Sequence, residues 1–240
     1  MFIFPEESNI KDKIWWKSLL QTVGYLLTPK YCLYCQRQIY NDIGLCRHCW
    51  QNIQWASATH IDRKEVQLME HFPISHLYSL APFHQGEEIR ELIHHLKYNH
   101  RKEIGFYLGE IIGERIQDSW SSFAWDIVVP IPLHFIKKWR RGYNQSDYIG
   151  QGIASVLHIP LIKDGLKRVR YTKTQTQLDK EKRTHNMNDA FAIQDREALQ
   201  GKRILLVDDV FTTGATLNGA LKALAHLNGI EVGVATISLT

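Results

Sequence analysis

Cysteine is scarce in this sequence of 240 residues, and long apolar runs are missing. The four cysteines all fall between Cys32 and Cys49, and no segment approaches the roughly 20 apolar residues that a membrane-spanning helix needs. Met1 to Lys13 also lacks the basic stretch followed by an apolar stretch that marks a secretory signal peptide. We therefore expect a cytoplasmic protein without a membrane span, whose cysteines bind metal rather than form disulfides.

A P-loop is absent as well, because no G-x-x-x-x-G-K-[ST] pattern occurs, and this excludes a P-loop NTPase. The formal charge of +4 is modest but unevenly distributed. The segment from His134 to His185 holds 12 Lys and Arg against 4 Asp and Glu, while the rest of the chain has 17 basic and 21 acidic residues. This segment favours a polyanionic ligand, although charge alone fits a solvated basic face equally well.

The most informative stretch is RILLVDDVFTTGATL, from Arg203 to Leu217. Ile204 to Val207 is typical of a strand buried on both faces of a parallel sheet. Asp208 and Asp209 follow where that strand is expected to end, and Thr212-Thr213-Gly214-Ala215-Thr216 comes next. Leucines at spacings of three and four then predict a helix: Leu217, Leu221, Leu224 and Leu227.

This order of strand, acid pair, loop and helix is typical of a phosphate-binding site. The first turn of the helix offers unpaired N–H groups and a positive dipole end. Gly214 allows a close backbone approach to a ligand, and the three threonine hydroxyls can donate to phosphate oxygens. Asp208 and Asp209 suit sugar hydroxyls, or a Mg²⁺ ion held together with phosphates. Ligands of open α/β sheets bind at the carboxyl ends of strands, where these residues are expected.

Receiver domains of response regulators also carry an acid pair after such a strand. They need most of their domain downstream of it, including an aspartate that accepts the phosphate. Only Asn218 to Thr240 follow the loop here, and they contain no aspartate. The receiver hypothesis is excluded on length.

A second strand is predicted over Asp126–Pro132, followed by a basic loop and a helix over Ser146–Leu157. Arg140 and Arg141 supply forked donors and Gly142 a close backbone approach, so the loop is expected to form a second anion site. The hydrophilic run Tyr171–Arg183 is interpreted as a lid rather than as a disordered segment. Upstream, the periodicity predicts a strand over His76–Phe83 and helices over Glu87–Leu96 and Ile104–Ile116.

The cysteines form two C-x-x-C pairs separated by ten residues: Cys32, Cys35, Cys46 and Cys49. This spacing predicts a closed tetrahedral Zn²⁺ site, structural rather than catalytic, that supplies the folding energy of a small module. An amphipathic helix over Ile14–Leu27 completes the module (1–55), a linker (56–72) follows, and 73–240 form the main domain. His94, His95 and His100 are expected to be solvated, because adjacent histidines on a helix point apart.

The Asp208–Thr216 segment resembles the phosphoribosyl-pyrophosphate (PRPP) loop of type I phosphoribosyltransferases, in which two acids and Thr-Thr-Gly-x-Thr follow a hydrophobic strand. Further motifs occur in the order seen in ComF-family proteins, and the resemblance extends from about residue 14 to the end. They are the four cysteines, Ile89-Arg90 with Leu96-Lys97-Tyr98, Pro130–His134, Arg140–Gln145, Lys173–Gln177 and Arg183–Phe191.

The resemblance implies an α/β protein of type I phosphoribosyltransferase fold, a parallel sheet flanked by helices, with a small N-terminal zinc-binding module. It implies that Thr212 to Thr216 hold the 5′-phosphate of PRPP bound with Mg²⁺, and that Asp208 and Asp209 hold the ribose hydroxyls. Arg140, Arg141 and Gly142 would face the pyrophosphate. Asp208, Asp209 and Arg141 are then the catalytic candidates.

Two functions remain open at this point. One is transfer of a phosphoribosyl group to an acceptor that the sequence does not specify. The other is a non-catalytic adaptor that binds single-stranded DNA, on whose bases Trp139 and Tyr143 could stack. The link of ComF-family proteins to DNA uptake during natural competence implies competence proteins as partners in either case.

Overall fold

The computed structural model describes residues 30–41, 43–57, 61–62, 73–83, 86–119, 123–169 and 190–240. The helix predicted over Ile14–Leu27 and the lid predicted over Tyr171–Arg183 lie outside these residues, as does most of the predicted linker 56–72. In the part of the chain that is described, no helix is both long and apolar enough to cross a bilayer.

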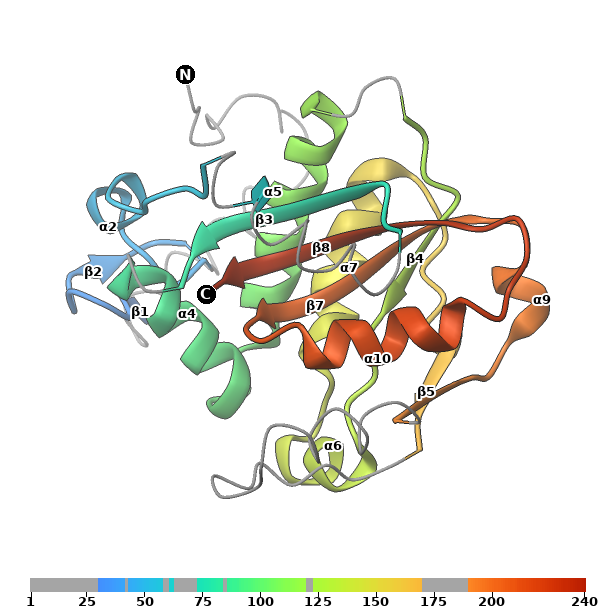
Figure 1. Ribbon diagram of the computed structural model, residues 1–240. Helices are drawn as coiled ribbons and strands as arrows, with labels where there is room; N and C mark the ends of the chain where they lie inside the picture. The colour runs from blue at the N-terminus through green and yellow to red at the C-terminus, as the bar shows by residue number, and fades with distance from the viewer. Residues whose placement is uncertain are drawn as a thin grey trace, which may run out of the picture.

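A four-stranded parallel sheet forms the centre of the molecule (Figure 1). Its strands lie in the order β3 (His76–Pro82), β8 (Glu231–Leu239), β7 (Arg203–Phe211) and β4 (Ile127–Pro130). Both faces of the sheet are covered, so β7 and β8 are apolar along most of their length instead of alternating with polar residues. The predicted parallel α/β sheet is thereby confirmed.

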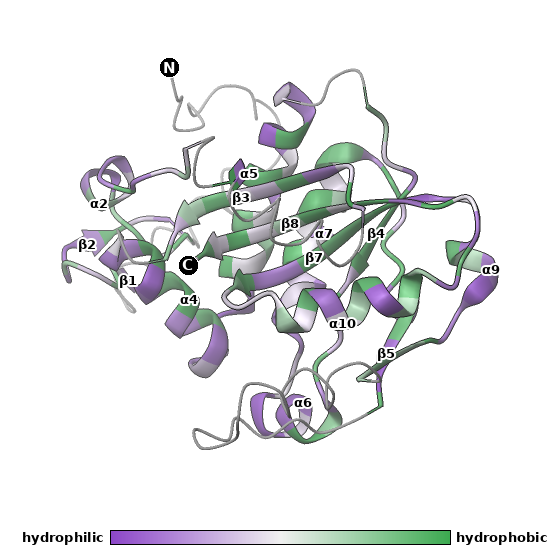
Figure 2. Ribbon diagram, viewed as in Figure 1, coloured by the Kyte–Doolittle hydropathy of each residue, from purple (hydrophilic) through white to green (hydrophobic). Residues whose placement is uncertain are grey.

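Helices bury the two faces of the sheet in two separate cores. The first face packs on α4 (Glu87–Tyr98), α5 (Lys102–Ser119) and α7 (Gln145–Leu157), and its strand residues include Leu205 and Val207. The opposite face packs on α10 (Ala215–Leu224) through Ile204 and Leu206. Figure 2 shows the central strands as largely hydrophobic and the outer turns of α4 as hydrophilic. The two-residue alternation of β7 thus divides its side chains between the cores.

Helices α5 and α7 cross at a contact between glycines. A Cβ atom on Gly109 would lie 2.1 Å from the backbone oxygen of Ile149, and one on Gly152 would lie 2.0 Å from the backbone oxygen of Phe106. Only glycine allows backbones to approach this closely. The contact sets the position of α7, whose first turn lies beside the acid pair.

Two strands and two short helices complete the main domain. Strands β5 (Leu166–Arg168) and β6 (Phe191–Ile193) form a separate antiparallel pair, and α9 (Arg196–Leu199) precedes β7. Helix α6 (Phe135–Arg141) lies between β4 and α7. Its N-cap His134 accepts a hydrogen bond from the Ile136 amide at Nδ1, and Gly142 ends the helix with a left-handed φ of 80°.

The cysteine module consists of β1 (Lys30–Tyr31), β2 (Gln38–Ile39) and α2 (Arg47–Gln51). Its buried residues belong to the same hydrophobic cluster as those of α4 and α5. Trp50 packs edge-to-face on Tyr107 of α5, with ring centroids 5.8 Å apart, and the Tyr34 hydroxyl donates to Glu87 of α4 at 2.9 Å. The module is therefore docked on the helical layer.

Two local predictions were wrong. Strand β7 does not end at Val207, because its backbone continues to pair with β8 through Phe211 and Leu239, so Asp208 and Asp209 lie within the strand. The segment after β4 is not a loop throughout, because residues 135–141 form α6. The other strands and helices predicted within the described residues are present, with ends shifted by a few residues.

Candidate functional site

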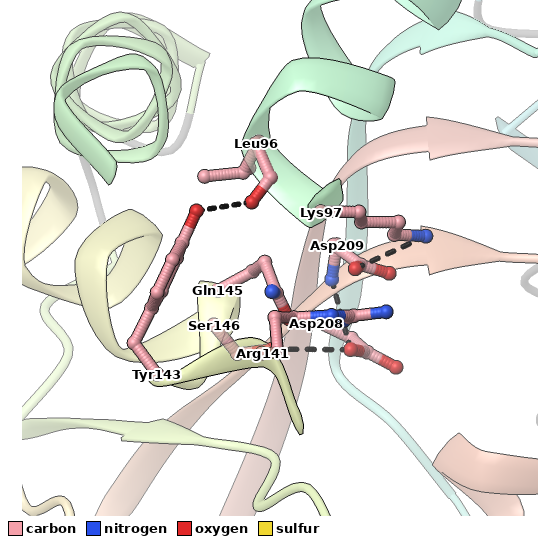
Figure 3. Close-up of polar contacts among 8 residues, drawn as sticks. All are labelled: Leu96, Lys97, Arg141, Tyr143, Gln145, Ser146, Asp208 and Asp209. Atoms are coloured by element: carbon pink, nitrogen blue, oxygen red, sulfur yellow. Dashed lines mark hydrogen bonds and ion pairs between the residues drawn. The ribbon is translucent and has the colours of Figure 1, made fainter. Parts of the chain in front are cut away.

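The acid pair lies toward the carboxyl end of β7 and is bonded to two distant parts of the chain (Figure 3). Asp208 Oδ1 accepts hydrogen bonds from the Ser146 hydroxyl at 3.2 Å and from the Asp209 amide at 2.8 Å. Asp209 Oδ2 forms an ion pair with Lys97 Nζ at 3.1 Å. Strand β7, the end of α4 and the start of α7 therefore meet at these two carboxylates.

The two carboxylates are not equivalent electrostatically. Burial, followed by repulsion from the neighbouring charge of Asp209, raises the pKa of Asp208 to about 7. The hydrogen bonds from the Asp209 amide and Ser146, and the charge of Lys97, act in the opposite direction. Near neutral pH the pair thus holds one carboxylate that gains or loses a proton readily.

Several cations gather around this pair. Burial and the positive charges of Arg168 and Arg141 lower the pKa of Lys137, while Asp209 opposes that shift. Burial also lowers the pKa of Arg168, whose charge interacts with that of Asp208. Partly buried cations in excess of the local acids favour a polyanion.

The predicted phosphate loop is placed directly beyond the acid pair. Thr212 and Thr213 are exposed, and Gly214 adopts a left-handed conformation with a φ of 74° as the N-cap of α10. Gly214 has no side chain to cap this helix, and the Ala215 amide donates to Thr213 Oγ1 at 3.5 Å. The positive dipole end of α10 therefore lies at the loop, where it favours an anion. Ala215 and Thr216, the first two residues of α10, are partly exposed. The loop, the helix terminus and the acids form one continuous segment, as the sequence predicted.

The three residues predicted to form the second anion site occupy different environments. Arg141 donates from Nη1 to Gln145 Oε1 at 2.5 Å, and its guanidinium lies over the Tyr98 ring, 5.5 Å from the centroid. Arg140 is exposed in the last turn of α6. Gly142 serves as the C-cap of that helix, and its amide donates to the Lys138 carbonyl at 2.8 Å. Arg141 is thus joined to the start of α7, beside the acid pair.

Sequence reasoning missed four residues of this site as members of it: Lys97, Lys137, Ser146 and Arg168. Lys97 lies in the last turn of α4, a helix far from the PRPP-like loop in sequence, and its motif gave no indication of an ion pair with Asp209. Ser146 follows Gln145 at the start of α7, and a serine at that position is also common in ordinary helices. These residues could have been found only from the topology of the sheet, because the residues that follow neighbouring parallel strands meet at the same edge.

The four cysteines converge in the docked module. Their Sγ atoms all lie within 4.8 Å of one another, and the Sγ atoms of Cys35 and Cys46 are 3.6 Å apart. All four are free thiols, and Cys32, Cys46 and Cys49 are buried. This donor set fits a tetrahedral Zn²⁺ ion, in which Zn–S bonds of about 2.3 Å place neighbouring sulfurs a little under 4 Å apart.

Backbone donors surround one of the thiols. Burial raises the pKa of Cys32, but backbone N–H groups of Cys35, Cys46 and Tyr34 outweigh it and bring the pKa down to about 7. Such N–H donors stabilise a thiolate, the form that binds metal. His48, between two cysteines of the sequence, lies near Asn52 and outside this sulfur cluster.

The histidines of α4 were wrongly predicted to point apart. The ligand atoms of Glu91, His94 and His95 lie within 4.8 Å of one another, and His95 Nε2 is 3.2 Å from Glu91 Oε1. The spacing of four residues on a helix brings Glu91 and His95 together. His94 is exposed, in agreement with the solvated surface that was expected.

Comparison with known proteins identifies the family of this chain. The phosphoribosyl transferase domain model matches residues 145–238, from the start of α7 through β8, and so includes the acid pair and the threonine loop. Competence protein F of Haemophilus influenzae is 30% identical over 210 residues, which cover 85% of this chain and 87% of that protein. The chain belongs to the ComF family.

A second ComF relative is the DNA utilization protein YhgH of Escherichia coli, 30% identical over 189 residues that cover 78% of this chain and 80% of that protein. Among solved structures, an adenine phosphoribosyltransferase aligns with a TM-score of 0.39 and 14% identity over 72% of this chain and 89% of that one. This ComF-family chain has a domain of phosphoribosyltransferase type, as the domain model shows, and a cysteine cluster able to hold a metal such as zinc.

Proposed function

We propose that this chain binds PRPP, or a related ribose phosphate, with Mg²⁺ at the acid pair and the threonine loop. One observation carries the proposal: Asp208 and Asp209 lie between two helix N-termini, those of α10 and α7, and among partly buried cations. A sugar that bears phosphates at both ends requires this combination of acceptors for its hydroxyls and donors for its phosphates. The family and the phosphoribosyl transferase domain support the same ligand class.

Each predicted residue has a role in this proposal. Thr212, Thr213, Gly214, Ala215 and Thr216 hold the 5′-phosphate, and Asp208 and Asp209 accept hydrogen bonds from the ribose hydroxyls. Arg141, together with Arg140 and the backbone at Gly142, faces the diphosphate. When bound, Mg²⁺ would neutralise diphosphate charge, and the carboxylates are the protein oxygens suited to that ion.

We propose phosphoribosyl transfer as the reaction of this site. The bond between the anomeric carbon and the diphosphate oxygen breaks, an acceptor nucleophile bonds to that carbon, and pyrophosphate leaves. The chain's residues then act by holding the sugar in position and by stabilising negative charge on the leaving group, and none needs to form a covalent bond. Structural zinc in the cysteine module accords with a reducing compartment such as the cytoplasm.

Calorimetry with PRPP and Mg²⁺ tests the binding. Asp208→Asn combined with Asp209→Asn should abolish the heat of binding, because both acceptors for the ribose hydroxyls are replaced, while the unliganded variant remains folded. An exposed carboxylate elsewhere, changed in Asp164→Asn, provides the matched control. Unchanged affinity in the double variant would remove the acid pair from the ligand site.

Release of pyrophosphate tests the reaction. The wild-type chain is incubated with PRPP and Mg²⁺ and a panel of nucleobases and amines, and pyrophosphate is measured by a coupled assay. Turnover that depends on one acceptor and is lost in Arg141→Met supports transfer. Tight binding of PRPP without pyrophosphate release across the panel would leave a binding function in place of an enzyme.

A second candidate function, binding of single-stranded DNA, rests on the surface of α6. Phe135 and Trp139 are 70% and 84% exposed, and they lie four residues apart on a helix that also exposes Lys138 and Arg140. Exposed aromatics among cations suit stacking on bases beside a phosphate backbone. Tyr143 does not share this role in the structure, because it is half-buried and its hydroxyl donates to the Leu96 carbonyl.

Salt dependence tests the DNA candidate. The affinity for a poly-dT oligonucleotide should fall steeply with salt, with about −0.7 on the log–log slope for each phosphate neutralised. Lys137→Ala with Lys138→Ala should make the slope shallower, and Trp139→Ala should weaken binding while leaving the slope unchanged. PRPP competes if Arg141 serves both ligands. Absence of binding at low ionic strength would exclude this function.

A further inference from the structure

Gln145, the first residue of α7, has a buried side chain with half of its hydrogen-bonding capacity unused. It is 1% exposed, and its Nε2 has no hydrogen-bond partner in the part of the chain that the structure describes. Its Oε1 accepts from Arg141. Buried amide groups are normally satisfied, so an orphaned donor beside a candidate site indicates a missing acceptor.

Arg141 fixes which end of the amide is the donor. A guanidinium can only donate hydrogen bonds, so the amide oxygen of Gln145 must face Arg141 and the NH₂ group must face away. The unmatched group is therefore an N–H donor. Its partner must be an acceptor, such as a phosphate oxygen.

The neighbourhood of this donor also favours an anion. Asn144, the N-cap of α7, makes no side-chain cap and instead donates from Nδ2 to Asp147 Oδ1 at 2.7 Å, so the positive end of a 13-residue helix lies beside Gln145. Ser146, the next residue, bonds to Asp208, and Figure 3 shows Arg141, Gln145 and Ser146 together at the acid pair. The positive charge of Lys137 lies within electrostatic reach of Arg141 and Asp209.

This anion position differs from the one at the threonine loop. The loop precedes α10, whereas Gln145 begins α7, and Asp208 lies between the two because it is bonded to Ser146. A ligand whose ribose is held at the acid pair can therefore place one phosphate at each helix. The 5′-monophosphate belongs at the threonine loop, and a group at the other end of the sugar belongs at Gln145.

We propose that Gln145 is a specificity-determining residue that donates from Nε2 to the diphosphate of PRPP, so that the site distinguishes PRPP from ribose 5-phosphate. The proposal rests on the ribose phosphate binding proposed above. Arg141 is held by Gln145 as a second donor to the same diphosphate. Gln145 and Arg141 together bind the diphosphate, the group that ribose 5-phosphate lacks.

Calorimetry with three probes tests this role: ribose 5-phosphate, inorganic pyrophosphate and PRPP, each with Mg²⁺. Gln145→Leu removes the donor at similar volume, and Gln145→Glu keeps an acceptor for Arg141 but replaces the donor by a second oxygen. Both variants should bind pyrophosphate and PRPP about 10- to 100-fold more weakly, as expected for loss of a hydrogen bond to a charged group. Their affinity for ribose 5-phosphate should stay within about twofold of that of wild type, because this ligand has no diphosphate for Gln145 to contact.

Gln151→Leu is the matched control, because Gln151 is exposed on the same helix; it should bind all three probes as wild type does. Wild-type affinity for pyrophosphate in Gln145→Glu, or an equal loss for ribose 5-phosphate, would overturn the role of Gln145 alone. A wild-type chain that binds none of the probes would overturn the proposed function itself. Melting curves establish that each variant is folded. If Gln145→Leu does not fold, Gln145→Glu still tests the role of the donor, because it retains an acceptor for Arg141.

Discussion

At the scale of single residues, the protonation of Asp208 connects stability with ligand binding. Its pKa lies at about 7 in the folded chain, because of burial and the charge of Asp209, against an ordinary value of 3.8. The folded state holds this proton more tightly than the unfolded chain does. The contribution of Asp208 to stability is therefore complete below pH 3.8 and is lost as the pH rises through about 7.

Asp208→Asn should therefore stabilise the ligand-free protein at neutral and alkaline pH. The variant carries no charge to bury, so its melting temperature should exceed that of wild type by about 2–4 °C at pH 8, the shift that ~1 kcal/mol gives in a domain of this size. The difference should shrink as the pH is lowered from 7 toward 4. Calorimetric melts across this range measure it, with Asp164→Asn as the exposed control. A difference that is constant with pH would contradict the raised pKa.

Ser146→Ala should raise the pKa of Asp208 further, because a hydrogen bond that favours the carboxylate is lost. Ribose hydroxyls bind best to the ionised acid, so the affinity for ribose 5-phosphate should increase with pH, and the midpoint should lie higher in the variant. Titrations at a series of pH values give the midpoint. Ser155→Ala on the same helix removes a hydroxyl that donates to the Gly152 carbonyl at 2.7 Å, and it should leave the midpoint unchanged. Coincident profiles would show that Ser146 does not act on Asp208.

The sequence identified those site residues whose chemistry is contained in one segment. Asp208 and Thr212 to Thr216 follow one another along the chain, so their motif carries both their identity and their proximity. Lys97 and Ser146 reach the acids only through the packing of α4 and α7 against β7. Such proximity depends on tertiary contacts between remote residues, which no local pattern encodes.

At the scale of elements, the close crossing of α5 and α7 determines where the first turn of α7 lies. The crossing depends on Gly109 and Gly152, because a Cβ atom on either would overlap a backbone oxygen of the facing helix. The N-terminal residues of α7, including Ser146, are carried by this helix to the carboxyl end of β7. A packing contact therefore supports the geometry of the site at a distance.

Gly152→Ala should destabilise the fold even though alanine is the better helix former. The propensity gain of at most about 1 kcal/mol is outweighed, because a methyl group 2.0 Å from the Phe106 oxygen forces the helices apart; overpacking of this kind costs about 1–3 kcal/mol or more. Denaturant unfolding measures the change. Gln151→Ala, on the exposed face of the same helix, should be close to neutral. A more stable Gly152→Ala variant would contradict the crossing.

Elements were predicted well where an apolar pattern was long and poorly where local and tertiary signals disagreed. The helices now seen as α4, α5 and α7 follow their apolar periodicity closely. The two acids suggested the end of a strand, yet β7 continues because β8 offers pairing partners as far as Leu239. The basic segment before Gly142 was taken for a loop, although a glycine that follows lysines and arginines is also a C-terminal signal for a helix such as α6.

At the scale of the whole molecule, the cysteine module and the main domain share one hydrophobic cluster. Cys32, Leu45 and Cys49 are buried together with Leu92 and Leu96 of α4. The division into 1–55, 56–72 and 73–240 stays a prediction. The shared cluster does imply that disturbing the module exposes apolar surface of α4, so that a metal in the module stabilises more than the module itself.

One Zn²⁺ ion should be found per chain, and its removal should lower the melting temperature of the whole protein. Elemental analysis of the purified chain gives the stoichiometry, and melts with and without a strong chelator give the shift. Cys46→Ser should lose the metal, because one of four ligands is replaced. His48→Ala, adjacent in sequence but outside the sulfur cluster, should retain it. Near-zero zinc in a folded wild-type chain would refute a metal at this site.

The end of β8 has a practical consequence for all these measurements. The Thr240 amide donates to the Phe211 carbonyl at 2.9 Å, and Phe211 immediately precedes the threonine loop, so Thr240 lies at the rim of the candidate phosphate site (Figure 1). A purification tag fused after Thr240 would emerge at that rim. A polyhistidine tag there would bring imidazoles, and any metal they carry, next to the phosphates of the ligand. Binding data should therefore come from protein that carries no tag at this end of β8.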